Sequence, residues 1–341
     1  RLDTREITMR RQLLLALLAA ATPFGVRAAT VPVYTVAASM SAPDGSWDYA
    51  QADDSGSHVY IARSNGVTII DLANGSVSSL GGVQHGHAVV PLPDGRLLVT
   101  SGADATVRLF DLSSGSQTAS IAVGKDPDAA ILDGTRTHAY VMNAESGTVS
   151  VIDLATAKVT KTIPVKPALE YAAFASDGTL FINNEDAGEI DTVNVAAGVA
   201  GKAIALPGCK APTGLAYDKT GNRLIAACAN GKAAIVDAGK RTLTTLIDIG
   251  NGPDAVLLDE ARGLAFIPCG KAGVLEILSL SGENVSHVAT VKTEVGARTG
   301  ALDPKTGAIY LPTAKFGPPA KPGGRPTLLP GSFHILIVRP A

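Results

Sequence analysis

Short apolar stretches alternate with turn-forming residues along the chain, and one arrangement of them occurs seven times. A polar or small residue opens an apolar stretch, a turn rich in Gly and Asp follows, and a second apolar stretch ends in small polar residues. The copy from Trp47 reads WDYAQADDSGSHVYIA, and the copy from Pro253 reads PDAVLLDEARGLAFIPC. From Asp128 onward, successive copies begin about 41–44 residues apart. A repeat of this length built from short strand-like runs is typical of the four-stranded blade of a β-propeller.

The third copy shows how four strands fit within one repeat. The pattern predicts strands at residues 128–132, 138–142, 148–154 and 158–164, separated by segments rich in Asp, Gly, Asn and Ser. The third strands of several copies have similar sequences, such as VRLFDL and VSVIDL, in which alternating apolar positions lead into an Asp and a hairpin turn. We therefore predict an all-β protein, a seven-bladed β-propeller with four-stranded blades.

The last copy lacks a fourth strand in sequence order. After the stretch IYLPTA comes a Pro- and Gly-rich insertion at residues 315–332, followed by a single apolar run, FHILIV. An unpaired apolar run at residues 31–38 precedes the first copy. Pairing of this N-terminal run beside residues 333–338 would close the ring and remove two exposed sheet edges. This closure makes residues 29–341 a single propeller domain.

The N-terminal segment has the features of a secretory signal peptide. Met9 and two arginines lead into the apolar run QLLLALLAAA, and small residues stand at the expected positions before a cleavage site after about Ala28. We predict that residues 1–28 are an upstream extension and a signal peptide, and that the mature protein is periplasmic or secreted. The paired arginines also suit twin-arginine export, but the Leu-rich run favours the general route.

Composition and charge narrow the range of partners. The chain has 29 basic and 31 acidic residues, and removal of residues 1–28 takes away five basic and two acidic ones, which leaves a net charge of −5. Without a basic stripe to displace counterions, a nucleic-acid partner is not expected. No second apolar run reaches membrane-spanning length, so we expect no membrane span after signal cleavage. Aromatic residues are only 4% of the chain, so small aliphatic residues must fill the core.

Two segments of the third copy, YVMN at residues 140–143 and SGTVSVIDLATAKV at residues 146–159, resemble the YVTN-type β-propeller repeat proteins of bacteria, a WD40-like group. Tyr140-Val141-Met142-Asn143 nearly matches the strand motif for which the family is named. Residues 146–159, SGTVSVIDLATAKV, are similar to the turn, strand and hairpin that follow that motif in the family. The resemblance covers roughly residues 31–339. It implies a propeller fold and a secreted or periplasmic binding protein, without an agreed reaction.

Propeller geometry brings the opening residues of the seven copies together. The innermost strand of each blade lines the central channel and its neighbour runs antiparallel, so the start of the first strand and the end of the second lie on one face. We therefore predict that these residues surround one mouth of the channel. The opening residues are Asp48, His87 (or His85), Asp128, Glu170, Thr213, Asp254 and Arg298. The loops after the second strands add Asn143, Glu145, Asn184, Glu185 and Asp186, together with the insertion at 315–332.

Four of the seven opening residues are carboxylates, and such crowding predicts raised pKa values, a bound cation or a basic ligand group. Arg298 could be a ligand clamp or a structural counter-charge for its neighbours. A purely structural role is the alternative for each opening residue, since Asp or Thr at the start of an inner strand often binds backbone N–H groups of the next blade. The expected ligand-binding residues are Asp48, His87, Asp128, Glu170, Glu185, Asp254 and Arg298.

The sequence offers limited support for metals and a disulfide. His85 and His87 would face the same way in an extended segment and could bind a metal, but carboxylates and amides around the mouth suit Ca²⁺ better than a transition metal. No cofactor is predicted beyond this Ca²⁺ option. Export permits disulfides, and Cys209 and Cys228 flank the first two strands of the fifth copy, so a bond between them is plausible. Cys269 would then be a buried thiol.

Two functional hypotheses remain open from the sequence. The first is a binding or scaffold protein that holds a small molecule, a peptide or a partner protein at the channel mouth and has no chemistry of its own. The second is a lactonase-type hydrolase or lyase that uses Glu170, His87 and Arg298 as acid, base and clamp, with Ca²⁺ as a potential aid. The chain contains no Gly-x-Ser-x-Gly, His-Glu-x-x-His or Cys-x-x-Cys-His motif, so several familiar enzyme classes are not indicated.

Overall fold

The computed structural model describes residues 32–319, 321 and 326–341. The predicted signal peptide, from Met9 to about Ala28, lies outside these residues. Within the part of the chain that the structure describes, no helix is long and apolar enough to cross a membrane.

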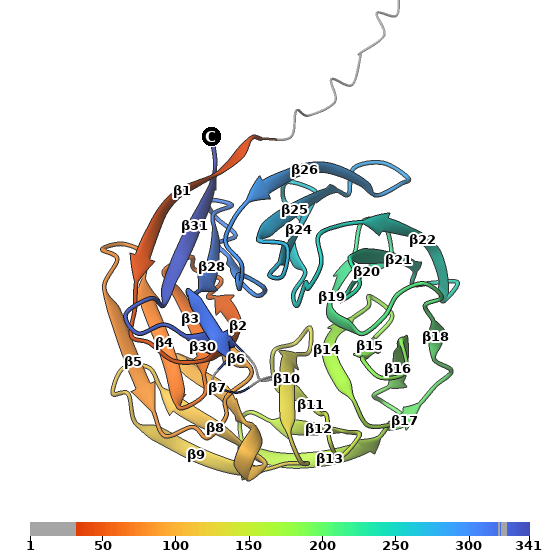
Figure 1. Ribbon diagram of the computed structural model, residues 1–341. Helices are drawn as coiled ribbons and strands as arrows, with labels where there is room; N and C mark the ends of the chain where they lie inside the picture. The colour runs from red at the N-terminus through yellow and green to blue at the C-terminus, as the bar shows by residue number, and fades with distance from the viewer. Residues whose placement is uncertain (1–31, 320, 322–325) are drawn as a thin grey trace, which may run out of the picture. The chain divides into compact units, whose positions relative to one another are not determined.

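Strands dominate the domain from Pro32 to Ala341, and they form seven antiparallel four-stranded sheets arranged as blades in a ring (Figure 1). Consecutive strands pair within each of the first six blades, which is the order expected when every connection is a short hairpin. The first three blades are β2 (Trp47–Ala52), β3 (His58–Arg63), β4 (Gly66–Asp71) and β5 (Val77–Gly81); β6 (Val89–Pro91), β7 (Arg96–Ser101), β8 (Thr106–Asp111) and β9 (Gln117–Ala122), with the short 3₁₀ helix η1 (Gly102–Asp104); and β10 (Pro127–Leu132), β11 (His138–Asn143), β12 (Thr148–Asp153) and β13 (Lys158–Pro164).

The next three blades follow the same plan, except that the outer strand of blade 4 is split in two. They are β14 (Leu169–Phe174), β15 (Thr179–Asn184), β16 (Glu189–Asn194), β17 (Val199–Ala200) and β18 (Ile204–Ala205); β19 (Pro212–Asp218), β20 (Arg223–Cys228), β21 (Lys232–Asp237) and β22 (Thr242–Asp248); and β23 (Leu257–Asp259), β24 (Leu264–Cys269), β25 (Val274–Ser279) and β26 (Ser286–Lys292). The prediction of a seven-bladed propeller is confirmed.

Blade 7 combines the two ends of the domain, as the unpaired terminal runs predicted. It consists of β27 (Ala301–Leu302), β28 (Ile309–Thr313), β31 (His334–Pro340) and β1 (Tyr34–Ser41). Strand β1 pairs antiparallel with β31 from Tyr34 opposite Pro340 to Ser41 opposite His334, and Figure 1 shows the two strands side by side. The closing strand begins at Tyr34, three positions later than the sequence pattern predicted. The insertion forms a small hairpin of β29 (Phe316–Pro319) and β30 (Pro326–Leu328).

Small aliphatic side chains fill the spaces between blades. One cluster joins residues of blades 2, 3 and 4, among them Leu98, Val141 and Ile182, which are fully buried. Aromatic rings are few, but Phe181, Phe266 and Phe333 are also fully buried. Close packing of alternate strand residues between adjacent sheets is what holds a propeller ring together, because each blade alone has an uncovered apolar face.

Candidate functional site at the channel mouth

All seven opening residues line a single cavity at one end of the central channel. The cavity has a volume of about 300 Å³. It is lined by Asp48, Tyr49, His87, Asp126, Asp128, Ala144, Glu170, Glu185, Thr213, Asp254 and Arg298. The arrangement follows from the repeat, because equivalent positions in successive blades face the same axis. We refer to this cavity as the channel mouth.

A β-bulge turns the opening residues toward the channel in four blades. In β2, Trp47 pairs with Arg63, but the next pair is Ala50 with Ile61, so one extra residue stands between them. The same shift occurs at the start of β10, β14 and β19. A bulge gives two successive side chains directions that regular alternation would not allow. Consequently both Asp48 and Tyr49 reach the cavity.

A second repeated feature is a left-handed residue two positions before the opening residue. His85 has φ 59° and Asp126 has φ 53°, and the equivalent residues of four other blades also have positive φ, namely Ala168, Ala211, Gly252 and Gly296. In blades 2 to 6 the carbonyl of this residue accepts a hydrogen bond from the residue that follows the second strand, such as Gly102 or Glu185. This bond holds both segments at the rim, which explains why Glu185 lines the cavity.

Ion pairs between blades connect the side chains of the mouth. His87 Nδ1 lies 2.7 Å from Asp48 Oδ2 and 3.1 Å from Asp128 Oδ1, so one imidazole joins the opening residues of blades 1 and 3. Arg298 Nε lies 2.7 Å from Asp254 Oδ2, and its Nη2 lies 3.5 Å from Asp48 Oδ1. Arg298 therefore pairs with carboxylates of blades 6 and 1, which is the counter-charge arrangement considered from the sequence.

Burial and like charge raise the pKa values of three acids at the mouth, Asp128, Glu170 and Asp254. Burial, followed by the charges of Asp254, Glu185 and Asp48, raises the pKa of Glu170 to about 9, although a hydrogen bond of 3.3 Å from the Tyr49 hydroxyl opposes this shift. Burial also raises the pKa of Asp254, but the Arg298 guanidinium limits it to about 6. Glu170 is therefore a carboxylic acid at neutral pH, not a carboxylate.

The pKa values of the His87 imidazole and the Asp128 carboxyl are also raised. Burial lowers the pKa of His87, but the hydrogen bond to Asp48 and the charges of Asp128, Asp48 and Asp126 outweigh it and bring the pKa to about 9. Burial and the nearby charge of Glu170 raise the pKa of Asp128 well above its usual range. The mouth therefore contains more acidic groups than its cations neutralise.

Some residues expected at the mouth have another place. Asn143 and Asn184 are buried ends of β11 and β15, not rim residues, and their amides bond within the sheet or to the segment beside it. The sequence pattern ended the strand of blade 3 at residue 142 and placed Asn184 in a loop, whereas both asparagines are the last residues of strands. Glu145 and Asp186 are exposed loop residues outside the cavity lining. Thr213 donates its hydroxyl to the Pro253 carbonyl of the next blade at 3.1 Å, which is the structural role considered for such positions.

Tyr49 and Asp126 were missed from the sequence. Tyr49 follows an opening residue, and strict alternation along a strand would direct it away from the channel. Asp126 precedes its opening residue by two positions, within a Lys-Asp-Pro turn that signals only a chain reversal. Its positive φ matches that of His85 in the previous blade, and this equivalence is visible only once the repeats are aligned by structure.

The three cysteines lie at equivalent strand ends or next to them. Cys209 and Cys228 form a disulfide that connects the segment before β19 to the end of β20. Cys269 ends β24 and is a buried thiol, and burial raises its pKa to about 12. The disulfide joins the entry to blade 5 to the end of its second strand, on the face that carries the mouth.

A larger depression of about 760 Å³ lies among the turns at the opposite ends of the strands. Its polar side chains are largely bound to one another, as in the turn where Asp53 accepts hydrogen bonds from Ser55, from the backbone of Ser57 and from His58. Such turn residues stabilise the loops themselves. The channel mouth is smaller, but its charged side chains converge from six blades and most of them are buried or half-buried, so it is the better candidate site.

The comparisons with known proteins support the fold. No model of a known protein family matches the chain, and no curated protein matches it. A chain of the Kuenenia stuttgartiensis hydrazine synthase is similar with a TM-score of 0.69 and 17% identity, over 78% of this chain and 92% of that chain. A chain of a mitotic checkpoint complex is similar with a TM-score of 0.72 and 15% identity, over 99% of both chains. At these identities the likeness shows the propeller fold alone.

Proposed function

We propose that the protein is an exported propeller of the YVTN repeat type that binds a cationic group at the channel mouth, without chemistry of its own. The ligand would be a small amine or guanidinium compound, or a basic side chain of a peptide or protein. One observation carries the proposal: six carboxyl groups converge on a cavity that contains only two cationic side chains among its lining residues, Arg298 and His87. The six are Asp48, Asp126, Asp128, Glu170, Glu185 and Asp254.

The cavity favours a small, positively charged ligand. A volume of about 300 Å³ is at the lower limit of known ligand pockets, and it accommodates one extended side chain or a short diamine. An anionic ligand would have to approach the same carboxyl groups and would be repelled. A cation that enters would favour the ionised form of Glu170, whose pKa is about 9 in the free protein, and would release its proton.

Calorimetric titration with matched probes tests this proposal. 1,4-Diaminobutane and agmatine are the cationic probes, and 1,4-butanediol and succinate are neutral and anionic counterparts of similar length. We expect binding of the cationic probes alone, weakened by salt, with proton release that appears as a dependence of the heat on the buffer. Equal binding of the diol, or no binding of either cation at millimolar concentration, would remove the proposal.

Two neighbouring acids provide a matched pair of variants. Glu185 lines the mouth, whereas Asp186 is the next residue of the same loop and lies outside the lining. We expect Glu185→Gln to weaken diamine binding roughly tenfold, corresponding to about 1.4 kcal/mol, and Asp186→Asn to leave it nearly unchanged. The same weakening in both variants would indicate a diffuse surface effect instead of a site.

An enzymatic function is the second candidate because of Glu170. A carboxylic acid that keeps its proton at neutral pH beside a tyrosine hydroxyl is suited to general acid catalysis. Arg298 would hold a carbonyl oxygen of the substrate across the same cavity. A screen of lactones with and without chelator, repeated with Glu170→Gln, tests this candidate. Turnover that the variant abolishes would support it, and absence of turnover would leave the binding function alone.

Export and partner binding are parts of the proposal with separate tests. The disulfide between Cys209 and Cys228 favours an oxidising compartment. Mass spectrometry of the protein secreted from the full sequence should give an N-terminus near residue 29.

The side chain of Phe316, on the β29–β30 hairpin, is 41% exposed and lies beside Trp47, so this hairpin is the proposed contact for a protein partner. Loss of a captured partner on replacement of Phe316 by Ser would support that role.

A further inference from the structure

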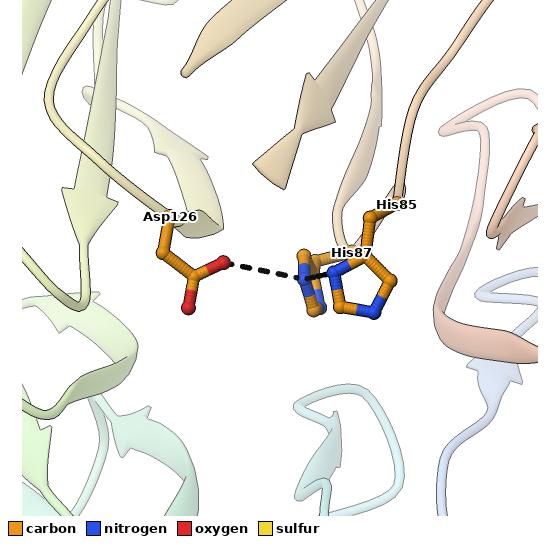
Figure 2. Close-up of side chains that lie close together, drawn as sticks. All are labelled: His85, His87 and Asp126. Carbon is orange, nitrogen blue, oxygen red and sulfur yellow. Dashed lines mark hydrogen bonds and ion pairs between the residues drawn. The ribbon is translucent and has the colours of Figure 1, made fainter. Parts of the chain in front are cut away.

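Two histidines and an aspartate place three donor atoms together at the rim between blades 2 and 3. His85 Nδ1 lies 3.0 Å from His87 Nε2, and His87 Nε2 lies 3.6 Å from Asp126 Oδ1 (Figure 2). All three atoms lie within 4.8 Å of one another. His85 is exposed, whereas His87 and Asp126 are half-buried, so the group is open to solvent on one side.

Two of these separations are close to those of ligands on one small ion. Zn²⁺ binds imidazole nitrogen and carboxylate oxygen at about 2.0–2.2 Å, so two ligands at the tetrahedral angle are about 3.3–3.6 Å apart. The measured separations of 3.0 and 3.6 Å around His87 Nε2 are close to this range. Three protein ligands leave a fourth position for water or a ligand atom, as in zinc sites with an open position.

The other ring nitrogen of His87, Nδ1, donates to carboxylate groups, as the second nitrogen of a metal-binding histidine commonly does. Nδ1 faces Asp48 Oδ2 at 2.7 Å and Asp128 Oδ1 at 3.1 Å, and these acceptors keep a proton on it. A metal would therefore bind at Nε2 and displace the proton that this nitrogen carries while the His87 imidazole is cationic. A carboxylate behind a ligating histidine fixes its tautomer and orientation and strengthens it as a ligand.

The repeat shows that the fold does not need these residue types. The left-handed turn position occupied by His85 and Asp126 is occupied by Ala168, Ala211 or glycine in four other blades. His and Asp are among the non-glycine residues that adopt a left-handed φ more often than most, but Ala168 and Ala211 show that this turn also forms with a side chain that cannot bind a metal. Two potential metal ligands in adjacent blades therefore occupy positions where the turn alone would accept alanine.

Gly102 leaves the space that the donor atoms occupy. A Cβ atom at this position would lie 2.9 Å from Asp126 Oδ1 and 3.0 Å from His87 Nε2. The equivalent position after the second strand is Ala144 in blade 3 and Ala229 in blade 5, so the local backbone accommodates a Cβ. A Cβ at Gly102 would thus shift the side chains that it faces, whereas the turn itself would accept it.

We propose that His85, His87 and Asp126 bind one divalent transition-metal ion, with Zn²⁺ as the ion that suits the set. Two nitrogen donors disfavour Ca²⁺ and Mg²⁺, which prefer oxygen ligands. The site goes beyond the proposed cation function and does not depend on it. His87 and Asp126 belong to both sets of residues. His85 is outside the cavity lining, whereas Glu170, Glu185 and Asp254 belong to the cavity alone.

The experiment uses the whole mature chain with a tag that contains no histidine. The protein is dialysed against Zn²⁺ or Ca²⁺, bound metal is measured by mass spectrometry, and Zn²⁺ affinity is measured by calorimetry. We expect one retained Zn²⁺ per chain, no retained Ca²⁺, and Co²⁺ substitution with the strong visible absorption of a tetrahedral site. Substoichiometric Zn²⁺, or Zn²⁺ displaced by excess Ca²⁺, would overturn the assignment.

Three variants and a control locate the ion. His85→Asn retains a residue that tolerates left-handed φ, and Asp126→Asn keeps the size of the side chain; each should weaken Zn²⁺ binding at least tenfold. Gly102→Ala should weaken it without removing any ligand. The control is His287→Asn, because His287 also pairs with a carboxylate, Glu276, on blade 6.

Unchanged Zn²⁺ affinity in His85→Asn and Asp126→Asn would overturn the proposal, and circular dichroism establishes that the variants are folded. Diamine titration of the same samples keeps the two proposals apart. Diamine binding without retained Zn²⁺ would refute the metal site alone, and retained Zn²⁺ without diamine binding would refute the cationic-ligand function alone.

Discussion

Glu170 is a buried acid whose pKa is raised to about 9, a value that lies within the range of a pH titration. Replacing it with glutamine removes the titrating group. The carboxyl has a pKa of about 9 in the folded protein against an ordinary value of 4.5, because it is buried beside Asp254, Glu185 and Asp48. Between these two values the folded state keeps a proton that the unfolded chain releases. The stabilisation from this proton is complete below about pH 4.5 and is lost as the pH rises toward 9.

The magnitude follows from the width of that interval. Each pH unit within it changes the free energy of unfolding by about 1.4 kcal/mol per proton. Between pH 5 and pH 8 the wild-type protein should therefore lose up to about 4 kcal/mol relative to Glu170→Gln, and about 2 kcal/mol if the proton is shared with a neighbouring carboxyl group. Glutamine does not titrate and has nearly the same shape, so the variant lacks this loss.

Urea unfolding at pH 5 and at pH 8 measures the difference. We expect the variant and the wild type to be similar at pH 5 and the variant to be the more stable at pH 8. Glu145→Gln is the control, since Glu145 is an exposed residue of a rim loop and should leave the pH dependence unchanged. Parallel curves for Glu170→Gln and the wild type would show that Glu170 is ionised at neutral pH and would refute the argument.

Three further predictions follow from the ion pairs, the disulfide and the closing strand. Arg298→Gln should lower the free energy of unfolding by about 2–4 kcal/mol at pH 8, where its partner Asp254 is ionised, and by less at pH 5, because the pKa of Asp254 is about 6. An equal loss at both pH values in urea unfolding would contradict the pairing. Replacing Cys209 and Cys228 by alanine should cost about 3 kcal/mol in the same assay, because the disulfide closes a loop between positions 19 apart; unchanged stability would contradict a bond that restrains the unfolded chain. Removing β1 should expose the edge of β31 and produce oligomers in light scattering, whereas a monomeric and equally stable product would contradict the closure.

The repeat made the ring and the contents of its mouth predictable. Equivalent positions of a repeat share one environment, so locating Asp128 at the start of an inner strand also located Asp254 and Arg298. The closing strand was predictable for a similar reason, since an incomplete last repeat and a spare strand at the other end account for each other. These inferences need only the period and the alternation of apolar residues.

The parts that the sequence did not reveal depend on departures from regular strand geometry. A bulge sends Tyr49 to the same side as Asp48, although alternation would separate them. Asp126 reaches His87 because its backbone is left-handed, and no local motif specifies that conformation for aspartate. Asn143 was expected in a loop because Asn is common in turns. It is instead the last residue of β11, and its side-chain amide donates a hydrogen bond to the Thr148 carbonyl of the neighbouring strand.

Closure of blade 7 by the two ends of the chain has a consequence for how the molecule assembles. Strand β1 is synthesised first among the strands, yet its partner β31 comes last, so β1 must wait for almost the entire domain before it can pair. Blades 1 to 6 contain only neighbouring strands and can form as the chain emerges. A chain that ends before β31 would therefore leave β1 and β28 with unpaired edges, and the ring closes only once β31 has been made.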